Sequence, residues 1–89
     1  MKVDDTAAAE VIKRLRRAEG QIRGVIGMIE AGRDCAEVVT QLAAASRALD
    51  RAGFRVISNG LEQCMHSDAD DDTKQADLEQ MEKLFLTLA

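Results

Sequence analysis

The sequence contains no proline, tryptophan or tyrosine, and its only aromatic residues are Phe54 and Phe85. With few β-branched residues as well, this composition argues against a β-sandwich or a β-barrel. The apolar runs are a few residues long, whereas a membrane-spanning helix needs about 20 apolar residues. Since no apolar signal segment opens the chain, we expect a cytoplasmic protein with no membrane partner. His66 is the only histidine, and without a second base or a Ser/His/Asp set we expect no enzyme activity.

Charge is distributed unevenly along the 89 residues, which we expect to form one domain, residues 1–89. The formal net charge is −4, but residues 11–55 carry a net charge of +4 and residues 56–89 carry −6. A basic middle segment is therefore hidden in an acidic total. One face of such a protein could attract nucleic acid while another face repels it.

Apolar residues recur at helical spacing in three segments, about residues 7–31, 34–65 and 73–88. In the first segment, steps of four and three residues join Val11, Leu15, Ala18, Ile22, Val25 and Ile29. The third segment begins at Asp72 or Thr73 as a helix cap, and its apolar side consists of Leu78, Met81, Leu84, Phe85 and Leu88. We therefore predict an all-α protomer of three helices.

The second segment is the longest of the three. Asp34 is placed to cap it, with Glu37 in the position of a capping box, and Gly32 is placed to end the helix before it. The same steps of four and three residues run through it and define what we call the seam: Cys35, Val39, Leu42, Ser46, Leu49, Gly53, Val56, Gly60 and Cys64. A helix over residues 34–65 would be about 48 Å long, whereas a compact domain of this size has a radius of gyration near 12 Å. Because one chain cannot cover such a seam, we predict an oligomer in which two long central helices pair antiparallel.

The antiparallel pairing would bring cysteines of two different copies close together. Along one helix Cys35 and Cys64 are about 44 Å apart, and a disulfide needs Cα atoms roughly 4.4–6.8 Å apart. In an antiparallel pair, Cys35 of one copy faces Cys64 of the other, which creates two equivalent sites. Cys35 lies in the first helical turn, where the helix dipole favours a thiolate. We predict that Cys35 is the nucleophile and Cys64 the resolving thiol; the alternative is that both are inert residues of the seam.

Basic residues cluster on two of the helices and form the candidate DNA-binding set: Lys13, Arg14, Arg16, Arg17, Arg47, Arg51 and Arg55. The last three are spaced by four residues on the side of the central helix opposite the seam. With no aromatic residues among them and no helix-turn-helix pattern, we expect contacts to the backbone and shape of a duplex. The alternative is a solvated basic face.

The segment Arg14-Leu15-Arg16-Arg17-Ala18-Glu19-Gly20-Gln21-Ile22-Arg23-Gly24-Val25, followed by Met28-Ile29-Glu30, Asp34-Cys35 and Cys64, resembles the CsoR/RcnR family of bacterial repressors. The resemblance implies an all-helical homotetramer, a dimer of dimers, that binds double-stranded operator DNA. It also implies that an inducer bound at the inter-subunit cysteine site releases the DNA. By position, Arg14 and Arg51 match basic residues associated with DNA binding in the copper-sensing members.

One departure from the family concerns the inducer. Copper-sensing members carry a histidine four residues before the second cysteine, where this chain has Gly60, and the extra histidines of the nickel and cobalt sensors are also missing. Two cysteines without a metal cofactor resemble the CstR-type branch, which senses persulfides and polysulfides. Two alternatives stay open: a Cu(I) sensor using Cys35, Cys64 and His66, and a helical interaction module that does not bind DNA.

Overall fold

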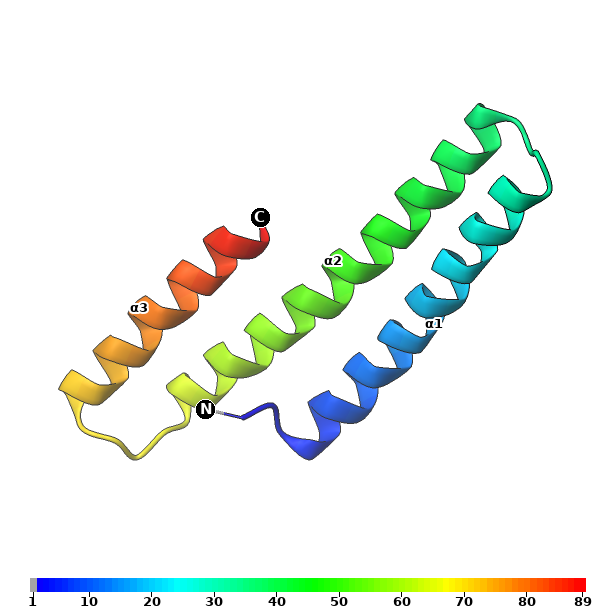
Figure 1. Ribbon diagram of the computed structural model, residues 1–89. Coiled ribbons are helices and arrows are strands. Elements are labelled where there is room, and N and C mark those ends of the chain that lie inside the picture. Colours follow the sequence, from blue (N-terminus) through cyan, green and yellow to red (C-terminus); the bar gives the residue numbers. More distant parts are fainter. Residues whose placement is uncertain (1) are drawn as a thin grey trace.

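The structure, a computed structural model, describes residues 2–89 and consists of three helices joined by short turns (Figure 1). They are α1 (Asp5–Glu30), α2 (Cys35–Met65) and α3 (Asp71–Leu88). No strand occurs within the described residues. The prediction of an all-α protomer with a long central helix is confirmed. No helix of this part of the chain combines the length and the apolar character that crossing a membrane requires.

Each helix begins at an aspartate whose carboxylate accepts a hydrogen bond from a backbone N–H of the first turn. These caps are Asp4, Asp34 and Asp70, which accept from Ala7, Ala36 and Thr73 respectively. The cap at Asp34 was predicted. The predicted starts of the other two helices were wrong by two residues, because Asp4 and Asp70 satisfy the free amides of the first turn before the expected residues can.

Two details near the turn between α1 and α2 also bear on the predictions. Gly32 has a φ of 72° and follows the C-cap of α1, Ala31; this left-handed conformation strains residues that carry a Cβ, which is why glycine ends the helix here. The predicted capping box is not formed. The carboxylate of Glu37 instead accepts hydrogen bonds from Nε and Nη2 of Arg33, both at 3.0 Å.

The three helices lie side by side in one layer, with α2 in the middle (Figure 1). Both α1 and α3 contact α2 and make no contact with each other in the described chain. The molecule measures 57 × 24 × 12 Å and has a radius of gyration of 17.1 Å. Its smallest dimension is close to the diameter of a single helix. A single layer cannot enclose a core, and both of its faces are open.

The contact between α1 and α2 uses small side chains and only part of the predicted stripe. Val11, Ala18 and Val25 repeat every seven residues and are buried, whereas Leu15, Ile22 and Ile29 are 41–61% exposed. On α2 the buried residues facing this contact include Ala45 and Ala52, also seven apart. Small residues let the two helices approach closely, and the larger side chains of the stripe remain outside the contact.

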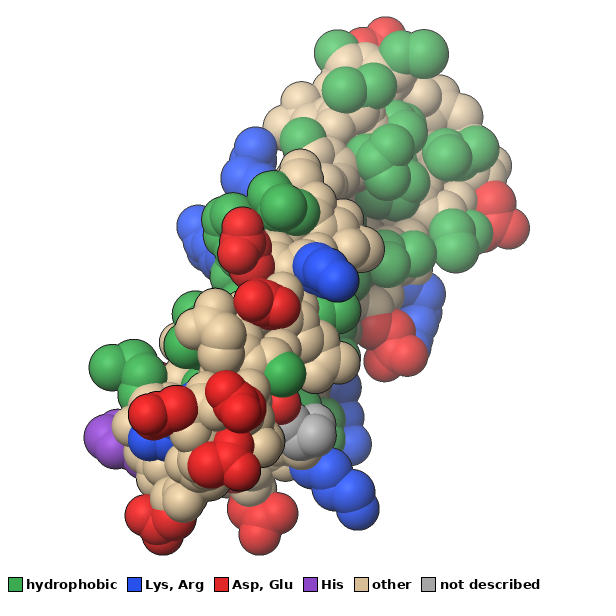
Figure 2. All heavy atoms as spheres, turned by 90° about the vertical axis from the view of Figure 1, so that its left-hand side faces the viewer, with side chains coloured by type: hydrophobic (Ala, Val, Ile, Leu, Met, Phe, Trp, Pro, Cys, Tyr) green, Lys and Arg blue, Asp and Glu red, His purple; other side chains and the backbone are tan. Residues whose placement is uncertain are grey.

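The seam of α2 is divided into two halves. Val39, Leu42 and Leu49 are 62%, 53% and 44% exposed in the protomer. The other half is covered by α3, whose Leu88 and Met81 lie against Gly53 and Gly60. Figure 2 shows the result: hydrophobic side chains gather on the upper part of the molecule, beyond the reach of α3. The prediction that one chain leaves much of the seam uncovered thus holds for its N-terminal half, whereas α3 covers the C-terminal half.

A polar contact fastens the start of the chain to α2. Asn59 is 1% exposed; its side-chain oxygen accepts from the backbone N–H of Asp4 at 3.1 Å, and its amide donates to the carboxylate of Asp4. One turn further on, Gln63 donates to the backbone oxygen of Lys2 at 2.6 Å. The hydrogen bond from Ala7, followed by that from Asn59, holds the pKa of the Asp4 carboxyl below its ordinary value.

This lowered pKa predicts a dependence of stability on acid. A depressed folded-state pKa stabilises the fold above the ordinary pKa of the carboxyl, and the stabilisation is lost as the pH falls through the folded-state value. The urea midpoint should therefore be flat above about pH 5 and fall below about pH 4. Asp4→Asn can still cap the helix but cannot titrate, so its profile should be flatter. Equal acid slopes for the variant and the wild type would contradict this role of Asp4.

Candidate functional site

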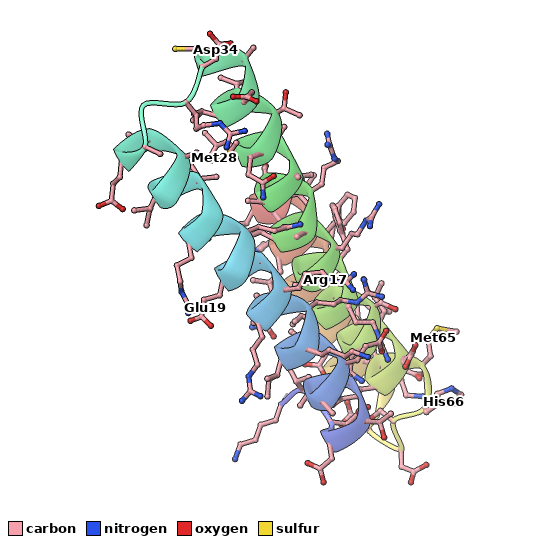
Figure 3. All side chains as sticks on the ribbon, turned by 90° about the vertical axis from the view of Figure 1, so that its right-hand side faces the viewer. Arg17, Glu19, Met28, Asp34, Met65 and His66 are labelled. Carbon is pink, nitrogen blue, oxygen red and sulfur yellow. The ribbon has the colours of Figure 1, made fainter. Side chains whose placement is uncertain are left out.

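The two cysteines lie at opposite ends of α2. Cys35 is exposed and directly follows the cap Asp34, whereas Cys64 is 4% exposed and lies in the last turn. Figure 3 shows the two ends through their neighbours, with Asp34 at one end and Met65 and His66 at the other. At 1.5 Å per residue the two cysteines are about 44 Å apart along the helix. Contact between them therefore requires two chains, and their pairing stays a prediction.

Around Cys35, the neighbouring charges largely compensate one another. Arg33, which would favour a thiolate, is held by Glu37 through the two 3.0 Å hydrogen bonds. This contact lowers the pKa of the Glu37 carboxyl and raises the pKa of the Arg33 guanidinium. Cys35 itself is exposed and is the first residue of α2.

Cys64 is buried in the last turn of α2. Gly60, one turn before it, is buried, and Met81 is the one buried residue of α3. A Cβ added at Gly60 would lie 2.3 Å from Sδ and 3.2 Å from Cε of Met81. A side chain at position 60 would therefore require the end of the Met81 side chain to move.

His66 is not part of a preformed metal site in the protomer. It is the exposed C-cap of α2, and Figure 3 shows its side chain next to Met65, pointing away from the helices. Among residues 2–89, no group of three His, Cys, Asp or Glu side chains is arranged to hold a metal ion. One chain alone therefore does not assemble the predicted alternative set of Cys35, Cys64 and His66.

A basic groove lies between α1 and α2. It has a volume of about 340 Å³ and is lined by Glu10, Lys13, Arg14, Arg17, Ala48 and Arg51. A second, more open hollow beside it shares Arg14 and Arg51 and adds Phe54 and Arg55. The structure thus brings five of the seven predicted DNA-binding residues together from two helices. Arg16 and Arg47 are exposed and line neither hollow.

Glu10 supplies the negative charge of the groove and pairs with Arg14 and with Arg55 of the adjoining hollow. Its carboxylate lies 2.8 Å from Nε of Arg55 and 3.4 Å from Nη2 of Arg14. The hydrogen bond from Arg55 lowers the pKa of Glu10, and the same bond raises the pKa of Arg55. A phosphate would have to compete with Glu10 for Arg55. Three cations of the groove make no ion pair within residues 2–89 and are the most available to an anion: Lys13, Arg17 and Arg51.

Three residues that matter for these sites escaped the sequence analysis: Glu10, Asn59 and Met81 as a neighbour of Gly60. Glu10 and Arg55 are 45 residues apart, and no local pattern relates them. Asn59 gave a weak signal in the sequence, because it lies among apolar helix positions. A side-chain amide that is buried at such a position needs a hydrogen-bond partner. Met81 belonged to the predicted apolar side of the third helix, but its place against Gly60 depends on how that helix folds back.

The chain combines an all-helical layer, a cysteine near each end of α2 and a basic groove. Residues 7–87 match the family described as "Metal-sensitive transcriptional repressor". The match extends over most of the sequence, and the chain belongs to this family.

Particular relatives support this assignment. The chain is 33% identical over 70 residues to the copper-sensing transcriptional repressor CsoR of Mycobacterium ulcerans, covering 79% of this chain and 60% of the relative. It is 42% identical over 53 residues to the copper-sensing transcriptional repressor RicR of Mycobacterium tuberculosis, covering 60% of this chain and 55% of the relative. The solved structure of the nickel-responsive transcriptional regulator InrS superposes with a TM-score of 0.80 at 27% identity, covering 100% of this chain and 98% of that one. The matches span less than two thirds of the length of CsoR and RicR.

Proposed function

We propose that the chain is a DNA-binding transcriptional repressor that works as a homo-oligomer, a dimer of dimers, in the cytoplasm. The family assignment supports a repressor, and the open faces of the single helical layer support assembly. The basic groove supports contact with operator DNA, because Arg14, Arg17 and Arg51 converge there from two helices. Lys and Arg side chains at this density act mainly on phosphates, which position a protein on a duplex.

The inducer, in this proposal, is a reactive sulfur species that acts on Cys35 of one copy and Cys64 of a second. The observation that carries this choice is that position 60, where the copper-sensing pattern has a histidine, is a buried glycine with the end of the Met81 side chain against it. Exposure also separates the roles of the two thiols, since Cys35 is exposed and Cys64 is 4% exposed. Cys35 is thus the thiol that a reagent meets first.

The chemistry proceeds in two displacements. The Cys35 thiolate attacks the sulfane sulfur of a persulfide R–S–SH, which gives Cys35–S–SH and releases the thiolate RS⁻. The Cys64 thiolate of the second copy then attacks the Cys35 sulfur, closes an S–S bond and expels HS⁻. Inorganic polysulfides can leave additional sulfur atoms in the bridge. Linking the ends of two α2 helices restrains the assembly, and a coupling of about 1–3 kcal/mol is the usual scale for such control of DNA affinity.

The test combines non-reducing electrophoresis, intact mass and DNA binding after treatment with polysulfide. We expect a covalent dimer with a Cys35–Cys64 link, added sulfur in its mass, and DNA affinity reduced by about 5- to 150-fold. Cys35→Ser should abolish the link, and Cys64→Ser should stop the reaction at a persulfide on Cys35. If the wild type forms no linked dimer and its DNA affinity does not change, sulfur sensing is wrong.

Cu(I) sensing is the second candidate, and two observations favour it. CsoR and RicR are both named copper-sensing, and the chain has two free cysteines. Thiolate donors suit Cu(I), whereas nickel suits imidazole, and His66 is the only histidine of the sequence. Stoichiometric Cu(I) that releases DNA without forming a covalent dimer would favour this candidate over reactive sulfur. If the reduced protein binds no duplex at low salt, the remaining alternative, a helical interaction module, gains support.

A further inference from the structure

The carboxylate of Glu10 bridges the two helices that form the basic groove. Its Oε2 lies 2.8 Å from Nε of Arg55 on α2, and its Oε1 lies 3.4 Å from Nη2 of Arg14 on α1. Among the described residues that line the groove and the adjoining hollow, Glu10 is the only acidic one. A single carboxylate, with one oxygen for each arginine, thus lies where cations from both helices converge.

Negative charge surrounds Arg55 on more than one side. Its side chain is 23% exposed, and its Nη1 lies 3.9 Å from Oε1 of Glu62, on the same helix. This Nη1 is buried and makes no hydrogen bond within residues 2–89. The charge of Arg55 is therefore compensated inside the protein by Glu10 and Glu62, in contrast to the unpaired cations of the groove.

A DNA phosphate and the Glu10 carboxylate compete for the same donors. Each presents anionic oxygens that accept hydrogen bonds from guanidinium N–H groups. A phosphate that approaches Arg14 or Arg55 must therefore displace Glu10 or remain beside its negative charge, and both reduce the net attraction. The Glu10 side chain is 42% exposed, so water screens its ion pairs and a phosphate can displace it.

We propose that Glu10 limits the affinity of the groove for duplex DNA by occupying, within the protein, the place of a phosphate. This inference rests on the proposed function, because it requires that the groove binds DNA. In this role Glu10 is a positioning residue, which acts on DNA through the two arginines that it holds. Competition with phosphates does not depend on base sequence, so a duplex of mixed sequence is a sufficient probe.

Glu19 provides a matched control for Glu10. It pairs with Arg23, four residues further along α1, at 3.7 Å, as Glu10 pairs with Arg14, but it lines neither hollow. Figure 3 shows Glu19 on the side of α1 away from α2. Replacing either glutamate with glutamine removes one negative charge from each subunit and nearly conserves the size of the side chain. The two variants therefore have the same net charge and differ in where the charge was removed.

The experiment is fluorescence anisotropy of a labelled mixed-sequence duplex with the full, reduced chain at several salt concentrations. Glu10→Gln should raise the affinity by about 10-fold near 0.1 M salt, and each arginine that it frees should make the slope of log affinity against log salt more negative by about 0.9. Glu19→Gln should change the affinity by less than about 2-fold. In an Arg55→Gln background the gain from Glu10→Gln should be smaller, because one of the two arginines that Glu10 holds is then missing.

Failure of this inference can be told apart from failure of the proposed function. If the wild type binds the duplex and Glu10→Gln binds no more tightly than Glu19→Gln, Glu10 does not limit the affinity and the inference is overturned, while DNA binding stands. Weaker binding by Glu10→Gln would also overturn it, because the carboxylate would then support the groove. If neither the wild type nor any variant shows salt-dependent binding, the groove does not bind DNA, and the proposed function fails together with the inference.

Discussion

We expect Arg51→Glu to lower the affinity of the reduced protein for operator DNA by about two orders of magnitude at 0.1 M salt. Arg51 lines both basic hollows, and none of the ion pairs within the described chain engages it. The substitution replaces a cation that can contact a phosphate with an anion that repels it, and a symmetric oligomer contains the change in every subunit. Each phosphate contact contributes about −0.9 to the slope of log affinity against log salt. Losing contacts should therefore make this slope less negative by about one unit or more.

Arg23→Glu is the matched control for Arg51→Glu. Arg23 also lies on a helix surface, but it pairs with Glu19 at 3.7 Å, its side chain is 75% exposed, and it lines neither hollow. Both variants change the net charge equally, so a general effect of charge would weaken DNA binding in both. Fluorescence anisotropy with a labelled duplex at several salt concentrations measures affinity and slope together. If Arg51→Glu binds like the wild type, or if both variants lose the same affinity, the groove is not the DNA-binding surface.

The second large effect concerns the contact of α3 with α2. Gly60→His restores the residue of the copper-sensing pattern, and we expect it to destabilise the protein by about 2–3 kcal/mol, because the new side chain must displace Met81 from the buried site. Met81→Ala removes the atoms that collide with it. The double variant should therefore be more stable than the sum of the two single effects predicts, by about 1 kcal/mol or more.

Urea unfolding at one fixed protein concentration measures these differences, since assembly makes apparent stability depend on concentration. Ser58→His is the control, because Ser58 is an exposed neighbour on the same helix and its substitution should change stability by about 0.5 kcal/mol or less. Additive effects of Gly60→His and Met81→Ala would show that the two residues do not compete for one space. The docking of α3 on Gly60 would then be wrong.

Much of the fold could be predicted from local patterns, because helices are specified by spacing and by caps. Asp34 and Gly32 correctly marked the turn between α1 and α2. The sequence could not show which residues of each apolar stripe are buried within one chain and which stay exposed. Val11 and Leu15 belong to the same stripe, yet Val11 is 7% exposed and Leu15 is 42% exposed, because which side of α1 faces α2 depends on how the two helices pack.

The candidate site was predicted less completely, for a physical reason. Cys35 and Cys64 were found from their types and spacing, and the basic residues from their periodicity. Their long-range partners follow from packing between segments 20 or more residues apart, which periodicity within one helix does not encode. Hence the ion pair of Glu10 with Arg55 and the contact of Met81 with Gly60 became visible only in the structure.

The docking of both chain ends onto α2 has a practical consequence for handling the protein. Lys2 accepts a hydrogen bond from Gln63, next to Cys64 in the sequence, and Leu88 lies against Gly53 in the middle of α2. An affinity tag fused without a spacer to either terminus would pull on the same helix that carries both thiols and Arg51. Purification with a cleavable tag on a flexible Gly/Ser spacer, removed before any titration, avoids this disturbance.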